Sequence, residues 1–359
     1  DKITPGYFRG AAICAYKANI TVNNCSFINN AAKWGGVAIY VEKGNLDVNN
    51  SVFINNTAGT SAAVEVFIGN LTVNNSVFVN NSGVDFGGAI HIFMGNITVD
   101  NSVFIANTVN NGSAIGGAIC VECGNVSVSN SIFINNSEEK DDVYDSGGGA
   151  IGIYGNSGFV IINNCSFINN TATNNGGAIE VSGNDGFVII INNCLFINNT
   201  ANSGSAIEVL CSSNITLSNS NFTNNNATEH FGSIHVLEGN LTANNCSFMN
   251  NNGKTGSAVV VENGNITIGG SIFINNYGTD YSGVVAVNVG NIYVDNCTFI
   301  NNTGRDGVVN TNYGNLTVIN SAFTHNELPI WVMEGNLVVI NSNFTNNFDG
   351  AISVSKGNL

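Results

Sequence analysis

Apolar and polar residues alternate along this chain in one phrase that returns with a nearly constant period. The copies align on a phenylalanine, and most neighbouring copies are 25 or 26 residues apart, as Phe53 is from Phe78 and Phe78 from Phe104. A period of this length is typical of a solenoid, in which one coil cannot bury its own apolar face and therefore stacks on its neighbours. The aligned phenylalanines are Phe27, Phe53, Phe78, Phe104, Phe133, Phe167, Phe196, Phe222, Phe248, Phe273, Phe299, Phe323 and Phe344.

Each repeat contains three short segments with the alternation of a β-strand. The first reads Gly-Gly-Ala-Ile, as at residues 87–90; the second reads Gly-Asn-Leu-Thr-Val, as at residues 69–73; the third surrounds the phenylalanine. Period-two alternation and enrichment in Val, Ile, Thr and Phe predict strands rather than helices. If every strand pairs with its equivalent in the next repeat, the chain is all-β. It then forms a single-stranded parallel β-helix of about 13 coils with three strands per coil. Right-handed coiling is expected for parallel crossovers.

Asparagine occupies two fixed positions in the repeat, three residues before and three residues after the phenylalanine, as Asn50 and Asn56 do around Phe53. Asparagine tolerates the left-handed backbone conformation that a tight corner needs. Stacked amides can also donate hydrogen bonds to one another along the axis. The pattern therefore predicts two polar ladders beside one aromatic file.

The repeats run through the whole sequence, which predicts one continuous parallel β-helix over residues 1–359. The last residues, Gly357, Asn358 and Leu359, lie inside a repeat phrase, so the helix is expected to be uncapped at both ends. Solenoids normally carry polar caps because a naked end exposes unpaired strand edges. Two alternatives follow: the chain is part of a longer protein, or its ends dock onto like ends and form a filament.

Charged residues are scarce, at 9% of the chain, and the net charge is −15. In-register stacking explains the scarcity, because like charges at a strand spacing of roughly 4.8 Å repel by about 1 kcal/mol even in water. The negative charge argues against nucleic acid and anionic membrane surfaces as partners. The sequence has no run of 18 apolar residues, so no membrane insertion is expected. No cofactor is predicted.

Nine cysteines are present, and five of them lie two residues before the phenylalanine, where other repeats have serine. A Ser/Cys column indicates a small buried position rather than a disulfide framework. Only Cys165 and Cys194 of this column fall on adjacent coils, which makes them the one disulfide candidate.

One column offers candidate catalytic residues, at the outward position after the Ala-Ile pair. Glu180 and Glu208 are expected to stack there, with His235 one coil further. Two carboxylates about 5 Å apart would suit retaining glycoside hydrolysis. The alternative is a mixed polar stripe on a solvated face, and the sequence favours this alternative because no Asp cluster or catalytic Lys/Arg pair accompanies the column. The protein is therefore expected not to be an enzyme. The column comprises Tyr40, Glu65, His91, Cys120, Gly152, Glu180, Glu208, His235 and Val260.

Two further groups of residues are candidates for binding or modification. Five acidic residues in the longest insertion can supply oxygen ligands for Ca²⁺, although a solvated acidic loop is favoured and no metal site is predicted. They are Glu138, Glu139, Asp141, Asp142 and Asp145. Several Asn-x-Thr sequons place the asparagine on the outward parity, where a glycan fits sterically. These glycosylation candidates are Asn70, Asn96, Asn240, Asn265 and Asn315.

The pairing of Gly-Gly-Ala-Ile with Phe-x-x-Asn in successive coils resembles the repeat of chlamydial-type polymorphic membrane proteins. The phrase Gly-Asn-Leu-Thr-Val-x-Asn-Ser-x-Phe-x-Asn-Asn is similar to adhesin-like surface proteins of methanogenic archaea. The resemblance implies an extracellular β-helix displayed on the cell surface, with structural or adhesive work. The expected partners are further copies, joined end to end through uncapped ends or laterally through outward apolar side chains, and glycans or a neighbouring cell surface. The alternative function is a polysaccharide-processing β-helix enzyme, either a hydrolase or a lyase.

Overall fold

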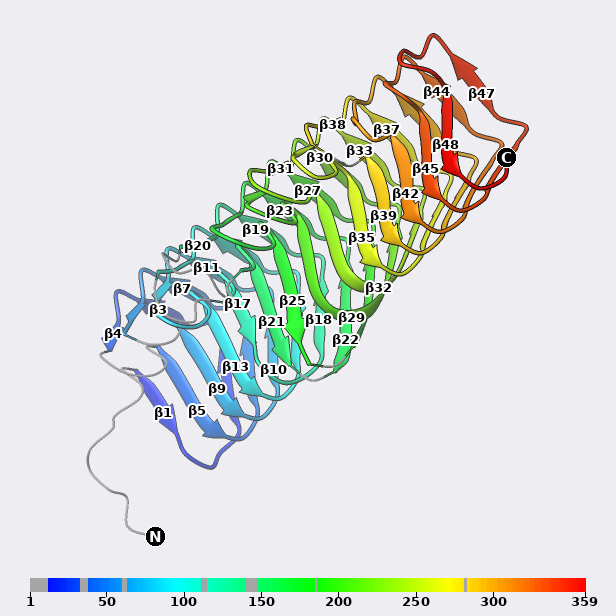
Figure 1. Ribbon diagram of the computed structural model, residues 1–359. Coiled ribbons are helices and arrows are strands. Elements are labelled where there is room, and N and C mark those ends of the chain that lie inside the picture. Colours follow the sequence, from blue (N-terminus) through cyan, green and yellow to red (C-terminus); the bar gives the residue numbers. More distant parts are fainter. Residues whose placement is uncertain are drawn as a thin grey trace. The chain divides into compact units, whose positions relative to one another are not determined.

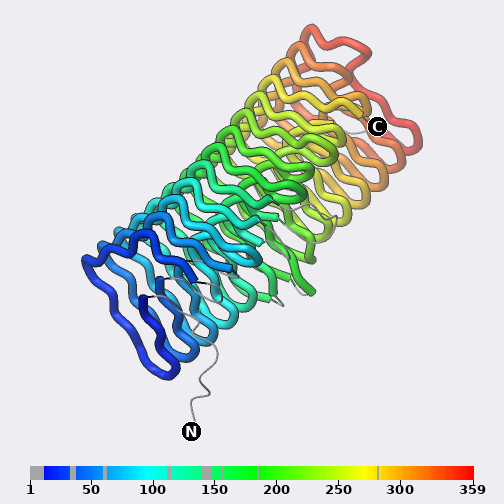
Figure 2. The backbone as a smooth tube through the Cα atoms, turned by 90° about the vertical axis from the view of Figure 1, so that its left-hand side faces the viewer, coloured from blue at the N-terminus to red at the C-terminus, as the bar shows by residue number. Residues whose placement is uncertain are grey.

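The computed structural model describes residues 12–32, 38–59, 63–110, 115–139, 147–155, 157–184, 186–280 and 283–359. The described elements are β-strands (Figure 1), and within the described residues no helix is long and apolar enough to cross a membrane. The chain divides into two compact units, residues 1–184 and residues 185–359, which are described separately. In each unit the backbone winds through successive coils (Figure 2).

Unit 1 repeats four kinds of strand. The strands that follow the Ala-Ile phrase are β1 (Ile13–Ala15), β5 (Ile39–Lys43), β9 (Val64–Ile68), β13 (Ile90–Met94), β17 (Ile119–Val121), β21 (Ile151–Gly155) and β25 (Ile179–Gly183). The Gly-Asn-Leu strands are β2 (Ile20–Asn23), β6 (Leu46–Asn49), β10 (Leu71–Asn74), β14 (Ile97–Asp100), β18 (Val126–Ser129) and β22 (Gly158–Asn163). The phenylalanine strands are β3 (Ser26–Ile28), β7 (Val52–Ile54), β11 (Val77–Val79), β15 (Val103–Ile105), β19 (Ile132–Ile134) and β23 (Ser166–Ile168). Two-residue strands follow: β4 (Ala31–Ala32), β8 (Thr57–Ala58), β12 (Ser82–Gly83), β16 (Thr108–Val109), β20 (Ser137–Glu138) and β24 (Thr171–Ala172).

Unit 2 repeats the same order, and two of its strands fuse the first and second kinds. The fused strands are β29 (Ile207–Ser218) and β32 (Ile234–Asn244). The remaining strands of these kinds are β26 (Phe187–Asn192), β35 (Val259–Asn263), β36 (Ile266–Gly269), β39 (Val285–Val289), β40 (Ile292–Asp295), β42 (Val309–Tyr313), β43 (Leu316–Ile319), β45 (Ile330–Glu334), β46 (Leu337–Ile340) and β48 (Ile352–Lys356). The phenylalanine strands are β27 (Leu195–Ile197), β30 (Asn221–Thr223), β33 (Ser247–Met249), β37 (Ile272–Ile274), β41 (Thr298–Ile300), β44 (Ala322–Thr324) and β47 (Asn343–Thr345). The two-residue strands are β28 (Thr200–Ala201), β31 (Asn226–Ala227), β34 (Asn252–Gly253) and β38 (Tyr277–Gly278).

Equivalent strands of successive coils pair in parallel and in register, which confirms the predicted all-β, right-handed parallel solenoid; its described strands form three sheets. Leu71 of β10, for example, pairs with Leu46 of β6 and with Ile97 of β14. The Ala-Ile and Gly-Asn-Leu strands share one sheet, the phenylalanine strands form the second, and the two-residue strands form the third. The sequence analysis did not separate this third sheet, because two residues are too few to show an alternation.

The phenylalanines stack as predicted in a single file inside each unit. In unit 1 the ring centroids of Phe53 and Phe78 are 4.6 Å apart with planes 3° from parallel. In unit 2 those of Phe222 and Phe248 are 4.8 Å apart with planes 6° from parallel. Both spacings follow the strand separation of roughly 4.8 Å. The file therefore forms wherever coils stack in register.

The asparagine three residues after each phenylalanine forms a buried amide ladder. The Nδ2 of Asn81 donates to Oδ1 of Asn107 at 3.0 Å and to the carbonyl oxygen of Phe53 at 3.0 Å. Each buried amide is thus satisfied by the coils on either side, as buried polar groups require. The asparagine three residues before the phenylalanine has the predicted left-handed conformation, with φ of 49° at Asn50 and 50° at Asn219.

Candidate functional site

The candidate catalytic column is buried in both units, so the expected solvated stripe is wrong. In unit 1 its residues pair in register from Tyr40 to Glu180. In unit 2 they pair from Glu208 through His235 to Asn310. The side chains nevertheless point away from the solenoid interior, since they alternate with the core residues of the Ala-Ile strands. Glu180 and Glu208 are each 1% exposed, and His235 is 3% exposed.

Where the segment that precedes an Ala-Ile strand is described, as before β13, β29 and β32, it contacts the outer face of that strand and contributes to this burial. We call these segments the cover. Bridges between Phe86 and Ile115, and between Ile115 and Gly147, link successive cover segments. A β-carbon on Gly152 would lie only 2.2 Å from Cγ2 of Ile115, which shows how closely the cover approaches the column. The Ala-Ile strands are therefore packed on both faces.

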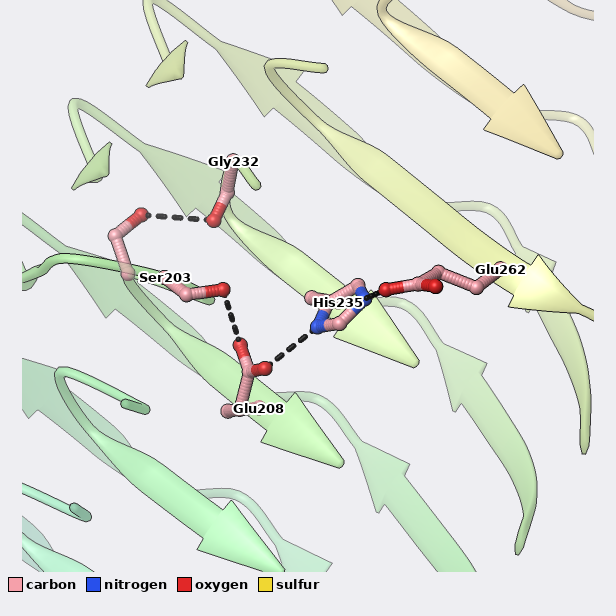
Figure 3. A network of polar contacts seen from close by, with 6 residues as sticks. Ser203, Glu208, Gly232, His235 and Glu262 are labelled. Atoms are coloured by element: carbon pink, nitrogen blue, oxygen red, sulfur yellow. Dashed lines mark hydrogen bonds and ion pairs between the residues drawn. The ribbon is translucent and has the colours of Figure 1, made fainter. Parts of the chain in front are cut away.

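In unit 2 a chain of polar contacts crosses three coils beneath the cover (Figure 3). The hydroxyl of Ser203 donates to Oε2 of Glu208 at 2.9 Å. Oε1 of Glu208 lies 2.5 Å from Nδ1 of His235, and Nε2 of His235 lies 3.1 Å from Oε1 of Glu262. The ring of Phe231, from the cover, stacks on the imidazole with centroids 3.9 Å apart. His235 is thus held on both ring nitrogens and on one face.

The two carboxylates determine the charge of His235. Burial by itself lowers the pKa of His235, but the negative charge and hydrogen bond of Glu208, together with those of Glu262, raise it to about 9. The hydrogen bond from His235 in turn lowers the pKa of Glu262. At neutral pH the cluster is therefore an imidazolium between two carboxylates.

Unit 1 contains a second cluster with the same order of residue types. Nε2 of His91 lies 2.8 Å from Oε1 of Glu122, whereas Nδ1 lies 3.9 Å from Oε1 of Glu65, beyond hydrogen-bonding distance. The ring of Phe86, from the cover, stacks on the imidazole with centroids 4.8 Å apart. In both units, therefore, a glutamate precedes the histidine in the column, and a second glutamate comes from the following coil.

The sequence analysis missed Glu122 and Glu262, because they lie two residues beyond the column on the following coil. A signal for them exists in the sequence. Both occur in a Val-Glu pair shortly before the Gly-Asn phrase of the coil that follows a histidine coil. Glu208 and His235 are brought together as predicted, whereas Glu180 belongs to unit 1 and the other two to unit 2.

The acidic insertion is only partly described, since Asp141, Asp142 and Asp145 lie outside the described residues. Glu139 is exposed, but Glu138 is buried, and its Oε2 accepts a hydrogen bond from the backbone N–H of Thr173 at 3.0 Å. Glu138 is thus not part of a solvated loop, because its carboxylate is turned toward the next coil. Among the described residues no group of three or more His, Cys, Asp or Glu side chains is arranged to hold a metal ion.

Cys165 and Cys194 are buried, as expected for the Ser/Cys column, whereas Cys25 is exposed. The thiols of Cys165 and Cys194 donate to the carbonyl oxygens of Asn163 and Asn192, at 3.2 Å and 3.1 Å. The two cysteines lie in different units, and the disulfide between them stays a prediction.

The five sequon asparagines are exposed, which meets the steric requirement for glycosylation. They belong to an outer amide ladder, in which Nδ2 of Asn96 donates to Oδ1 of Asn70 at 3.2 Å and Nδ2 of Asn265 donates to Oδ1 of Asn240 at 2.8 Å. Glycosylation itself stays a prediction. Asn315 follows Asn291 in the same ladder, with its Nδ2 3.0 Å from Oδ1 of Asn291.

Unit 2 has an open pocket beside the Glu208–His235–Glu262 cluster, with a volume of about 250 Å³. Its wall combines an aromatic ring, small apolar side chains, one carboxylate and several amides. The residues that form it include Phe231, Val260, Glu262, Ala286, Asn310 and Asn312. Glu262 therefore connects the buried cluster to a cavity that a small ligand can enter.

Paired parallel strands, stacked rings and amide ladders define a protein of the parallel β-solenoid class. The family model described as the right-handed beta helix region matches residues 149–302 and 232–358, which together span more than half of the 359 residues. The chain belongs to this right-handed β-helix family. No curated protein and no solved structure matches it.

Proposed function

We propose that this protein is a non-enzymatic, extracellular β-helical repeat protein that does structural or adhesive work at the cell surface. The observation that carries the proposal is the burial of Glu180, Glu208 and His235 beneath the cover. The carboxylate of Glu208 and the imidazole of His235 bond to each other between successive coils. The outer ladders consist of uncharged amides. A regular outer ladder of amides on a β-helical scaffold suits binding and assembly.

Assays of polysaccharide cleavage test the non-enzymatic part of this proposal. The wild-type protein and the Glu208→Gln variant are incubated with neutral and acidic polysaccharides, and reducing ends and unsaturated products are measured. We expect no products from either protein. Products from the wild type that disappear in the folded Glu208→Gln variant would establish the alternative, a polysaccharide hydrolase or lyase.

Self-association is the second part of the proposal, and exposed apolar side chains on β9 and β13 support lateral contacts between copies. The rings of Phe67 and Phe93 stack with centroids 4.5 Å apart, and Ile68 and Met94, 36% and 48% exposed, pair beside them. Stacked apolar residues of this kind form a patch rather than isolated exposed side chains. Electron microscopy of the purified protein distinguishes filaments and lateral bundles from single particles. Met94→Lys is expected to dissolve lateral bundles, and bundles that persist would remove the patch from the proposal.

Surface display is tested on intact cells of the source organism. Antibodies against the folded protein are expected to label unpermeabilised cells, and protease added outside is expected to remove the label. Labelling that requires permeabilisation would contradict an extracellular location.

A further inference from the structure

We propose that the open pocket beside Glu262 in unit 2 binds one ring of a neutral sugar and does not cleave it. The proposal rests on the adhesive role given above, and it names the chemistry through which one site of unit 2 would contact a surface.

The pocket lies where two successive residues of the buried column are small. After His235 the column continues with Val260 and Ala286 before it reaches Asn310. In unit 1 the corresponding positions after His91 are Cys120 and Gly152, and there Ile115 of the cover fills the space over Gly152. Among the described residues, the space over Gly152 in unit 1 is thus filled, whereas the pocket beside Val260 and Ala286 in unit 2 is open.

The deepest polar group of the pocket is the amide of Asn310, which is 2% exposed. Its Oδ1 accepts a hydrogen bond from the backbone N–H of Gly283 at 3.3 Å. Its Nδ2 donates to no group among the described residues. Asn310 lines the pocket, so this N–H group is available to a ligand that brings an acceptor oxygen there.

Acceptors and a second donor lie nearer the mouth. Oε1 of Glu262 is bonded to His235, and no described residue donates to its Oε2. Asn312 donates through Nδ2 to Oδ1 of Asn288 at 3.0 Å, which leaves Oδ1 of Asn312 and Nδ2 of Asn288 for a ligand. Hydroxyl groups satisfy such a mixture, because each can donate one hydrogen bond and accept others.

The other wall is apolar and consists of Phe231, Val260 and Ala286. A pyranose ring has C–H groups on its faces and hydroxyls around its edge, so it can place a face on this wall and its edge on the amides. The volume of about 250 Å³ lies below the usual range for small-molecule sites, roughly 300–1,000 Å³. The pocket therefore fits one ring, such as the terminal residue of a glycan.

The negative charge of Glu262 determines which classes of sugar the pocket accepts. The pKa of Glu262 is lowered by its hydrogen bond from His235, so its carboxylate is ionised, and no Lys or Arg is among the described residues that line the pocket. Uronic acids, sialic acids and phosphorylated sugars are therefore repelled. A purely cationic ligand would satisfy Glu262 but would leave Nδ2 of Asn310 without an acceptor.

Saturation-transfer NMR with methyl glycosides of glucose, galactose, mannose and N-acetylglucosamine tests the proposal, with methyl glucuronide and spermidine as contrasting probes. We expect the wild type to bind at least one neutral glycoside with a millimolar Kd, and neither contrasting probe. Ala286→Leu fills the pocket and is expected to weaken binding about tenfold or more. Glu262→Gln is expected to weaken neutral binding and to admit the glucuronide.

The matched control is Glu122→Gln in unit 1, which makes the same change beside His91 and is expected to leave sugar binding unchanged. Circular dichroism and thermal unfolding show that each variant is folded. Failure of all neutral glycosides to bind, equal binding by wild type and Ala286→Leu, or binding of spermidine alone would each overturn the proposal. Labelling of intact cells would still stand in these cases, so the site and the surface role fail separately. Release of a cleaved product would instead contradict the non-enzymatic function.

Discussion

The two units of this protein place the same three residue types in the same order, but they bond them differently. In unit 2 both ring nitrogens of His235 contact a carboxylate within 3.1 Å. In unit 1 only one nitrogen of His91 does so, because Glu65 is 3.9 Å away. A phenylalanine of the cover stacks on the histidine in each case.

The difference shows that the glutamate–histidine–glutamate motif has two roles in this protein. In both units it ties the cover to the outer face of the Ala-Ile strands. In unit 2 the second glutamate of the motif, Glu262, also lines an open pocket together with Val260 and Ala286 of the column. The cluster thus forms one wall of a candidate binding site in unit 2, whereas Ile115 of the cover fills the space over Gly152 in unit 1.

Removal of each histidine is the strongest test of this comparison. His235→Ala leaves Glu208, 1% exposed, without its cation, and loss of one partner of a buried ion pair costs about 3–5 kcal/mol. His91→Ala loses one short bond to Glu122, which is partly exposed, and is expected to cost about 1–3 kcal/mol. Repeat proteins do not unfold as a single cooperative unit, so native-state hydrogen exchange of β29 and β32 against β9 and β13 is the suitable measurement. Equal losses of protection in the two variants would refute the difference between the clusters.

The dependence of stability on pH tests the charge of His235. Its pKa is raised from 6.5 to about 9 by folding. The stabilisation from the raised pKa is therefore fully present below pH 6.5 and is lost as the pH rises through about 9, by on the order of 3 kcal/mol. Hydrogen exchange or urea unfolding of unit 2 at pH 7 and pH 10 measures the loss.

The same titration has an internal control. In His235→Ala the alkaline loss in unit 2 is expected to disappear, and a loss of unchanged size would assign it to another group. On the acid side the pKa of Glu262 is lowered by His235, so its contribution is present above the unfolded pKa and is lost as the pH falls.

Substitutions that enlarge one column residue by one or two methyl groups compare the filled space over Gly152 with the open pocket beside Ala286. They are expected to have the smallest effects on stability. Gly152→Ala places a β-carbon 2.2 Å from Cγ2 of Ile115 and 2.7 Å from the backbone nitrogen of Gly116, so overpacking is expected to cost about 1–3 kcal/mol. Ala286→Val adds methyl groups toward the pocket, next to Val260 in register, and is expected to cost less than about 1 kcal/mol. Native-state hydrogen exchange of β21 and β39 measures both, and a larger effect at Ala286 would show that the pocket is not open.

The fold was predictable because in-register stacking imposes the same requirement on every coil. The stacked phenylalanines and the left-handed asparagines recur in the sequence at fixed positions of the repeat, and the strand phrases recur with them. A requirement that acts on every coil leaves a column of one residue type, and such columns are visible without coordinates.

The burial of Glu208 and His235 was not predictable by the same reasoning. Alternation along a strand shows that their side chains point away from the interior, but it does not show what lies outside. The cover varies in length and composition from coil to coil, so it leaves no column. Phe86 and Phe231 are its clearest trace, because each is an aromatic residue shortly before an Ala-Ile strand that carries a histidine.

The most direct test of a buried, doubly bonded His235 is the protonation state of its ring. Nitrogen-15 NMR of histidine-labelled protein, assigned with His235→Ala, reports whether each ring nitrogen carries a proton. The account predicts an imidazolium protonated on both nitrogens at pH 8, with deprotonation near pH 9. A neutral ring at pH 8 that titrates near 6.5 would contradict it, because that ring would not lie between the carboxylates of Glu208 and Glu262.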